Sequence, residues 1–152
     1  MRRQLSRDDV LVDCSEDVCA VPADDLALAE LMYDAYRGTV DDEGETLEDA
    51  VHVIARLRDG EFGTLETDAS SVVVENGVVV AATLVTIEGG SPLVAFSMTR
   101  PSHSGRGLAR QGLRRATSRL AASGWDSVYL VVTIANTRAM SLYVSEGFAV
   151  VQ

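Results

Sequence analysis

The sequence predicts a mixed α/β protein with the element order strand, two helices, three antiparallel strands, helix, strand, helix, strand. Three observations lead to this prediction. Two stretches within residues 24–58 have the apolar spacing of amphipathic helices. The dipeptide Asn76-Gly77, which suits a tight hairpin turn, joins two β-rich runs. Farther along, a short apolar run, a glycine-bearing turn and a helical pattern follow one another. We expect a single domain over residues 1–152, because this length supports one sizeable core.

Composition favours a folded protein. Hydrophobic residues make up 47% of the chain, and no apolar run approaches the length of a membrane span. Arg2 and Arg3 are not followed by an apolar run, so we see no secretory signal. Cys14 and Cys19 form neither a C-x-x-C pair nor a group with histidines. We interpret them as reduced thiols of a cytoplasmic protein and expect no metal site.

The N-terminal segment has two candidate short strands, Val10–Val12 and Val18–Val21. Pro22 interrupts the second, and Asp24 or Asp25 is suited to cap a helix that runs to about Tyr36. The apolar face of this helix is expected at Leu28, Leu31, Met32 and Ala35.

The loop of residues 39–45 is rich in carboxylates and precedes a second helix. Thr46 and Asp49 resemble a capping box, and the helix should continue to about Arg58 before Gly60. Its buried face is expected at Leu47, Ala50, Val51, Ile54 and Leu57.

A hairpin comes next, after a predicted loop of residues 61–70. Its strands are expected at Ser71–Glu75 and Val78–Glu88, on either side of the Asn76-Gly77 turn. Gly89-Gly90 then leads into a third strand, which begins near Leu93.

The stretch from Ser97 to Arg119 combines features of a phosphate site. The apolar run Leu93–Met98 ends near Pro101, and a loop with Gly105 and Gly107 leads directly into a helix. The first turn of a helix presents unpaired N–H groups and the positive end of its dipole, which together attract phosphate. Apolar or small residues recur at every fourth position of the helix, and arginines take most of the rest: Leu108, Gly112, Ala116 and Leu120; Arg106, Arg110, Arg114, Arg115 and Arg119.

Two well-known phosphate loops are excluded. No G-K-[ST] occurs, which rules out a Walker A loop, and Arg110 stands where the dinucleotide fingerprint needs its third glycine.

Two motifs resemble those of the GNAT superfamily of N-acetyltransferases. Residues 104–109 read S-G-R-G-L-A and resemble motif A, Q/R-x-x-G-x-G/A, with serine in place of the first basic or amide residue. Residues 136–148 resemble motif B, N-x-x-A-x-x-L-Y-x-x-x-G-F, and match all six of its marked positions. The resemblance in sequence covers about the last third of the chain; before that, only the order of the elements agrees.

This resemblance implies a three-layer α/β/α fold. Its central mixed, mostly antiparallel sheet would be splayed between the strands at 93–99 and 127–133. One departure is that only Ala149–Gln152 remain after motif B, where the family closes with a strand pair. We expect either an open sheet edge or cover from a partner chain in a homodimer.

The resemblance also implies acetyl-CoA as acyl donor. Its pantetheine arm would bond the backbone of Ser97, Met98 and Thr99, with the Met98 N–H as oxyanion donor. We expect the side chains of Phe96 and Met98 in the core. Asn136 would cap a helix and also bind the pantetheine arm. Tyr143 would protonate the departing thiolate. The pyrophosphate would lie on Ser104, Gly105, Arg106, Gly107, Leu108 and Ala109.

The general base is less defined. Many family members place a glutamate on the central strands, but the strands at 93–99 and 127–133 carry no carboxylate. Glu88 is the nearest candidate, and the carboxylates of the 39–45 loop are a second possibility. Loss of the proton through ordered water is a third.

Charge divides the chain unevenly. Residues 1–99 carry six arginines and twenty-one acidic residues, whereas residues 100–152 carry seven arginines and two acidic residues. A basic phosphate site and an acidic region suited to a cationic amine fit this division, although a simple solubilising surface would also explain most of the carboxylates. Nucleic acid does not fit, because the whole chain has a net charge of −10.

The leading functional hypothesis is an N-acetyltransferase that transfers an acetyl group from acetyl-CoA to a primary amine of a small molecule or protein, by direct attack in a ternary complex. A catalytically weak acetyl-CoA-binding regulatory module is the alternative. A protein-interaction domain with a functional acidic face is a third hypothesis, against which the phosphate loop counts.

Overall fold

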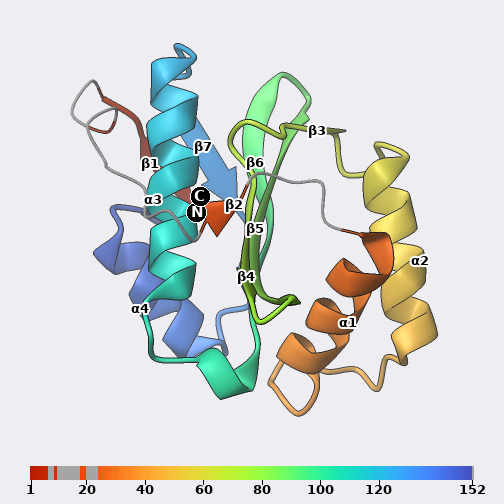
Figure 1. Ribbon diagram of the computed structural model, residues 1–152. Coiled ribbons are helices and arrows are strands. Elements are labelled where there is room, and N and C mark those ends of the chain that lie inside the picture. The colour runs from red at the N-terminus through yellow and green to blue at the C-terminus, as the bar shows by residue number, and fades with distance from the viewer. Residues whose placement is uncertain (7–8, 10–17, 20–23, 152) are drawn as a thin grey trace.

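The computed structural model describes residues 1–6, 9, 18–19 and 24–151. A central sheet is covered on one face by α1 (Asp25–Tyr36) and α2 (Leu47–Arg58), and on the other by α3 (Leu108–Ala122) and α4 (Thr137–Ser145) (Figure 1). The predicted three-layer α/β/α fold is therefore confirmed.

The sheet has the order β1-β7-β6-β5-β4-β2, and β3 pairs with β5 beside this path. Among the pairs of described strands only β6–β7 is parallel, so the sheet is mixed and mostly antiparallel, as predicted. The hairpin around Asn76-Gly77 also matches its predicted bounds. The strands are β1 (Arg2–Gln4), β2 (Val18–Cys19), β3 (Thr64–Leu65), β4 (Ser71–Glu75), β5 (Val78–Glu88), β6 (Ser91–Thr99) and β7 (Ser127–Leu130).

The helices begin where their caps predict. Asp24 caps α1 by accepting from the N–H of Leu26, and Thr46 and Asp49 form a complete capping box on α2. The α1 face is buried at Leu28, Leu31 and Met32, as expected. On α2 the prediction was wrong for Leu47 and Val51, which are 37% and 38% exposed. The helix packs along a narrower stripe than the sequence pattern indicates: Ala50, Ile54 and Leu57.

Gly112 sets how closely α3 approaches the sheet. A Cβ atom at this position would lie 2.0 Å from Oγ1 of Thr83 on β5. A larger side chain would therefore fit here only if the Thr83 side chain, or the strand that carries it, moved.

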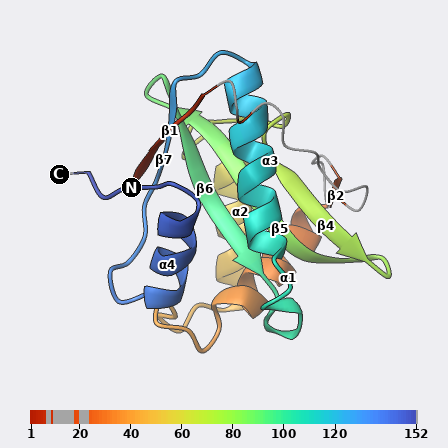
Figure 2. The same cartoon turned by 90° about the vertical axis from the view of Figure 1, so that its left-hand side faces the viewer.

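Three sequence-based expectations need correction. Residues 2–4 form β1, which lies against the edge of β7, so the chain's own N-terminal strand provides the cover that we expected to be missing or supplied by a partner (Figure 2). Ala149 then bonds Arg2 through both backbone groups, at 2.8 and 2.9 Å. The predicted loop of residues 61–70 contains β3, and β7 ends at Leu130 rather than Thr133.

Other N-terminal predictions lie partly outside the described residues. Val10–Val12 and Cys14 are not among them, and of the strand expected at Val18–Val21 only Val18–Cys19 is described, as β2.

Candidate active site

The C-terminal end of β6 borders a cavity because the pairing between β6 and β7 stops before that end is reached. The two strands pair only at Leu93–Tyr129 and Val94–Leu130. The pairing register between β5 and β6 shifts immediately beyond, so that Leu84 faces Phe96 while Val85 faces Val94. Such a bulge bends a strand and raises its local twist. Ser97–Thr99 consequently pair with β5 on one side and with none of the described strands on the other.

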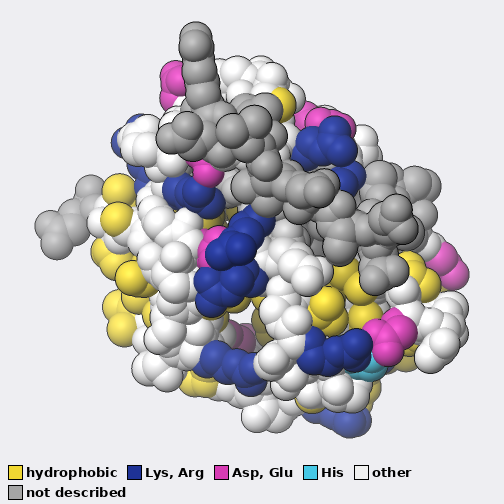
Figure 3. All heavy atoms as spheres, turned by 60° about the vertical axis from the view of Figure 1, so that its left-hand side comes forward, with side chains coloured by type: hydrophobic (Ala, Val, Ile, Leu, Met, Phe, Trp, Pro, Cys, Tyr) yellow, Lys and Arg dark blue, Asp and Glu magenta, His cyan; other side chains and the backbone are white. Residues whose placement is uncertain are grey.

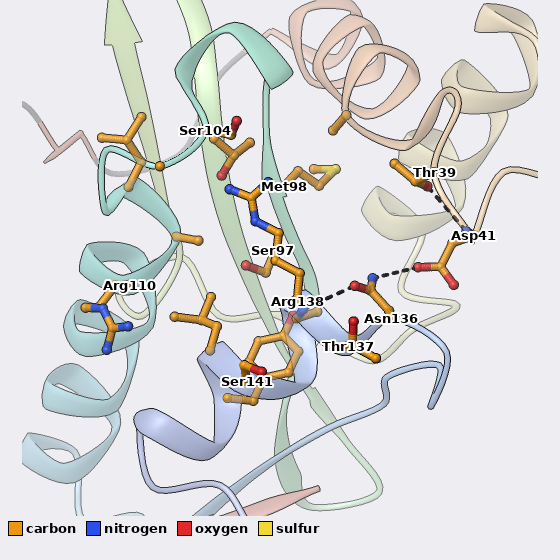
Figure 4. Close-up of a pocket in the computed structure, with 18 of the residues that line it drawn as sticks. Thr39, Asp41, Ser97, Met98, Ser104, Arg110, Asn136, Thr137, Arg138 and Ser141 are labelled. Carbon is orange, nitrogen blue, oxygen red and sulfur yellow. Dashed lines mark hydrogen bonds between the residues drawn. The ribbon is translucent and has the colours of Figure 1, made fainter.

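A cavity of about 840 Å³ fills this gap, and we call it the β6–α4 cavity. Figure 4 shows how segments far apart in the sequence meet around it. Its walls come from the end of β6, the glycine loop and start of α3, the segment around α4, and the loop after α1. Ten of the eleven sequence-predicted cofactor residues lie on these walls: Ser97, Met98, Thr99, Ser104, Gly105, Gly107, Leu108, Ala109, Asn136 and Tyr143.

The glycine loop opens onto the cavity. Gly105 and Gly107 both have a φ of 79°, and a Cβ atom on either would meet nothing within 4 Å. Gly107 is the N-cap of α3 and supplies no side-chain bond, so the N–H groups of the first helical turn remain available. The Ser104 hydroxyl instead forms a hydrogen bond within the loop, because it donates to the carbonyl of Pro101 at 2.9 Å.

Arginine side chains, in dark blue, lie at several places on the face shown in Figure 3. Most arginines of α3 have acidic partners within the protein. Arg106, which we expected at the phosphate, pairs with Glu75 at 3.3 Å and does not line the cavity. Arg110 and Arg114 both bind Glu146, whose side chain is only 4% exposed. Of these three arginines, Arg110 is the one that lines the cavity.

Arg138 is a site residue that the sequence reading missed. It is the second residue of α4, two positions after the N-cap Asn136. It is exposed and lines the cavity. In Figure 4 its side chain extends from α4 in the direction of Ser104. Within the described part of the chain its guanidinium group has no hydrogen bond or ion pair. The available signal was its place inside motif B, between Asn136 and Ala139.

Asn136 has two bonds at the start of α4. Its Oδ1 accepts from the N–H of Ala139 at 3.1 Å, which confirms the predicted N-cap. Its Nδ2 donates to Oδ2 of Asp41 at 3.0 Å, a contact with the acidic loop that no sequence pattern indicates (Figure 4).

Tyr143 lines the cavity from α4, with its ring packed edge-on against Phe148 at a centroid distance of 6.0 Å. Burial raises the pKa of its hydroxyl, and the Ser97 side chain offsets part of that rise. The hydroxyl is thus protonated at neutral pH, the state required of a proton donor.

Tyr36 and Asp41, from α1 and the loop that follows it, complete the wall opposite α4. Burial, followed by the nearby Tyr143 and Asp41, raises the pKa of Tyr36 well above its usual value. Among the described residues, Asp41 is the one carboxylate that lines this cavity.

Glu88 is not brought to the site. It pairs with Ser91 at the opposite end of the β5–β6 pair from Ser97–Thr99, is exposed, and does not line the cavity. The spacing in sequence was misleading because β6 runs antiparallel to β5 and carries the chain away from Glu88. Met98 behaves as expected, since its side chain is 2% exposed within the core.

Residues 27–148 match the sequence model of the Acetyltransferase (GNAT) family. The chain belongs to this family. No curated protein matches the sequence of this GNAT family member.

Solved structures resemble this GNAT family member in fold. The ribosomal-protein-S18-alanine N-acetyltransferase from Escherichia coli has a TM-score of 0.68 at 17% identity, covering 89% of this chain and 78% of its own. PaiA N-acetyltransferase from Thermoplasma acidophilum, solved with coenzyme A, has a TM-score of 0.68 at 15% identity, over 88% of this chain and 89% of its own. The aminoglycoside acetyltransferase AAC(6')-Iy, solved with a bisubstrate analogue, has a TM-score of 0.65 at 14% identity, covering 90% of this chain and 92% of its own.

None of the described helices of this GNAT family member is both long and apolar enough to cross a membrane.

Proposed function

We propose that this GNAT family member transfers an acyl group, acetyl in the simplest case, from acyl-CoA to a primary amine by direct attack in a ternary complex. The observation that carries the proposal is one cavity that joins an open strand edge, an uncapped helix N-terminus and a protonated tyrosine. Two of its fold relatives were solved with coenzyme A or with a bisubstrate analogue of it.

The residues present fit coenzyme A. The glycine loop leaves open space where side chains would project, and helix N-termini attract phosphate. The unpaired edge at Ser97–Thr99 suits the amides of an extended pantetheine arm. Oγ1 of Thr99 is buried without a hydrogen-bond partner among the described residues. Arg110 and Arg138 supply positive charge at the rim.

The donor, when bound, supplies a thioester carbonyl. The N–H of Met98 would donate to its oxygen as negative charge develops there. The amine must lose a proton before attack; its nitrogen then forms the new C–N bond as the C–S bond breaks. The Tyr143 hydroxyl gives its proton to the sulfur and regains one from the nitrogen as the amide forms.

Asp41 replaces Glu88 as the carboxylate best placed for the acceptor. It lines the cavity with Tyr143, and its loop adds further negative charge at Asp42, Glu43 and Glu45. Such a surface attracts a cationic amine, and this electrostatic attraction weakens as the salt concentration rises. We therefore include a cationic acceptor in the proposal.

The test is release of free coenzyme A from acetyl-CoA in the presence of polyamines, aminoglycosides, amino acids and peptide N-termini, together with thermal unfolding with and without coenzyme A. Stabilisation plus amine-dependent release supports the proposal. Stabilisation without turnover on any amine supports the binding-module alternative. Absence of both would reject the acyl-CoA site itself.

A further inference from the structure

Glu146 is a buried carboxylate that the proposed reaction does not use. Its side chain is only 4% exposed, although the residue is the C-cap of the short helix α4 and occupies an unmarked position of motif B. Removing a charged carboxylate from water costs free energy, so a buried carboxylate needs charged partners that bond it. The partners of Glu146 therefore show what it holds in place.

Two arginines of α3 are these partners. Nη1 of Arg110 donates to Oε1 of Glu146 and also to the Ser145 hydroxyl, the latter at 3.0 Å. Arg114 donates through Nε to Oε2 of Glu146 at 3.0 Å and through Nη2 to Oε1 at 3.2 Å. Among the described residues, these contacts are all the hydrogen bonds between α3 and residues 137–146. Glu146 thus ties α4 to α3.

This tie lies beside both halves of the proposed donor site. Arg110 is the third residue of α3, directly after the glycine loop, and it lines the β6–α4 cavity. In Figure 4 it lies on α3, across the cavity from Asp41. The N–H of Glu146 donates to the carbonyl of Tyr143 at 3.1 Å, so Glu146 belongs to the same turn as the proposed proton donor.

Arg110 keeps N–H groups for a ligand. Its bonds within the protein use Nη1 alone, and within the described part of the chain its Nε and Nη2 have no hydrogen bond. Arg114, in contrast, directs Nε and Nη2 to Glu146 and does not line the cavity. A planar guanidinium group can bond two anions through different N–H groups in a fixed geometry. Arg110 can therefore bind Glu146 and a second anion at the same time.

We propose that Glu146 is a positioning residue for the acyl donor: it holds Arg110 so that the remaining N–H groups bind a phosphate of coenzyme A. This inference rests on the proposed function. A mobile arginine side chain must be ordered when it binds a ligand, which lowers the affinity. The bonds to Glu146 and Ser145 order Arg110 before the ligand arrives. The phosphate is the pyrophosphate or the separate 3′-phosphate, and a shortened ligand distinguishes them.

Calorimetric titration with coenzyme A and with dephospho-coenzyme A tests the phosphate contact without an acceptor amine. Arg110→Gln should raise the dissociation constant of coenzyme A about tenfold, because a charge-assisted hydrogen bond is lost. A rise with coenzyme A alone assigns the contact to the 3′-phosphate, and a rise with both ligands assigns it to the pyrophosphate. Unchanged dissociation constants for both ligands would overturn the inference.

Glu146→Gln separates positioning from charge. The amide keeps one acceptor oxygen for two arginines and loses the negative charge, so Arg110 is held less firmly. We expect the dissociation constant of coenzyme A to rise about threefold to tenfold, the effect of ordering one long side chain. Removing a negative charge would by itself favour phosphate binding, and about 0.15 M salt screens that effect. Tighter binding in Glu146→Gln would mean that Glu146 acts through its charge alone and would reject the positioning role.

The double variant shows whether Glu146 acts through Arg110. Adding Glu146→Gln to Arg110→Gln should cause no further rise in the dissociation constant, whereas independent effects would add. Arg114→Gln is the matched control, because Arg114 bonds the same carboxylate but does not line the cavity. Its dissociation constant should stay within about twofold of the parent value. Additive rises in the double variant would contradict the inference.

Arg110→Lys covers the case in which Glu146→Gln does not fold. It keeps the charge that faces Glu146 but lacks the fixed fork of a guanidinium group, so the dissociation constant should rise about threefold. Denaturant unfolding without ligand reports whether each variant folds. Absence of coenzyme A binding in the parent would reject the proposed function as well. Equal binding by the parent, Arg110→Gln and Arg110→Lys would reject only this inference.

Discussion

The side-chain amide of Asn136 donates a hydrogen bond of 3.0 Å to Asp41, which lies 95 residues earlier in the chain. This bond joins the start of α4, on one face of the sheet, to the loop after α1, on the other (Figure 1). The same amide caps α4 through its oxygen. One side chain therefore fixes both a helix terminus and the carboxylate that we assign to the acceptor amine.

The two roles of Asn136 can be separated by substitution. Asn136→Ala removes both bonds and should lower the free energy of unfolding by about 1 kcal/mol, the usual cost of losing an N-cap. Asn136→Ser keeps a capping oxygen but loses the donor to Asp41, so its stability should be near that of the parent while the acceptor KM rises. Denaturant unfolding and steady-state kinetics measure the two effects. A normal acceptor KM in both variants would show that the Asp41 bond has no part in binding.

Gly107 tests the phosphate site. If the glycine loop holds the pyrophosphate, coenzyme A at a hundredfold excess over its dissociation constant should stabilise the protein by about 2.7 kcal/mol. Gly107→Asp places a negative charge against the phosphates and should abolish this stabilisation. Gly107→Asn introduces a side chain of the same size without the charge, and both residues tolerate positive φ comparatively well.

Thermal unfolding with coenzyme A compares the two Gly107 variants. A retained shift in Gly107→Asn and its loss in Gly107→Asp is the expected result. Equal shifts in both would place the phosphates elsewhere.

Tyr143→Phe removes one hydroxyl and leaves the ring against Phe148. Stabilisation by coenzyme A should persist while turnover falls about a hundredfold to ten-thousandfold, the usual contribution of general acid catalysis. Tyr129→Phe is a suitable control because Tyr129 lies on β7 and does not line the β6–α4 cavity. Unchanged turnover in Tyr143→Phe would mean that another group protonates the thiolate.

The contact between α3 and β5 depends on the absence of a side chain at Gly112. Gly112→Ala would place a methyl group 2.0 Å from Oγ1 of Thr83, so that the Thr83 side chain, the helix or the strand must move. We expect a loss of about 1–3 kcal/mol, which exceeds the gain of alanine over glycine in helix propensity. The double variant Gly112→Ala with Thr83→Ala relieves the clash and should recover part of the loss. A single variant as stable as the parent would contradict the close approach.

Alkaline pH should destabilise the protein through its buried tyrosines. Burial raises the pKa of Tyr36 and of Tyr143 above the ordinary value of 10.0. The unfolded chain ionises these hydroxyls near 10.0 while the folded protein keeps them protonated, so unfolding releases protons. Their contribution to stability is fully present below pH 10 and is lost as the pH rises above it.

Tyr36→Phe checks this sign. Above pH 10, the free energy of unfolding of Tyr36→Phe should fall less steeply with rising pH than that of the parent. Denaturant titration at each pH measures both free energies. The difference between the two proteins at pH 7 serves as the reference. An equally steep alkaline decline in the variant would assign the effect to other groups.

The sequence by itself determined the order of α1, α2, β4, β5, β6, α3, β7 and α4. It also determined the caps at Asp24, Thr46 and Asn136, the Asn76-Gly77 hairpin and the glycine loop before α3. Each of these depends on a few neighbouring residues whose backbone preferences are strong, so a local pattern is sufficient. The family followed from two such local motifs and was confirmed.

Tertiary structure alone decided the rest. The polar residues Arg2–Gln4 form a strand because β7 offers them an edge, and Leu47 and Val51 stay exposed because none of the described segments buries that side of α2. Asp41 replaces Glu88 as the candidate carboxylate for the same reason. The antiparallel course of β6 places Ser97–Thr99 far from Glu88, whereas the hydrogen bond from Asn136 holds Asp41 beside the cavity. Contacts between residues far apart in the chain depend on how whole layers pack, and no short stretch of sequence encodes that packing.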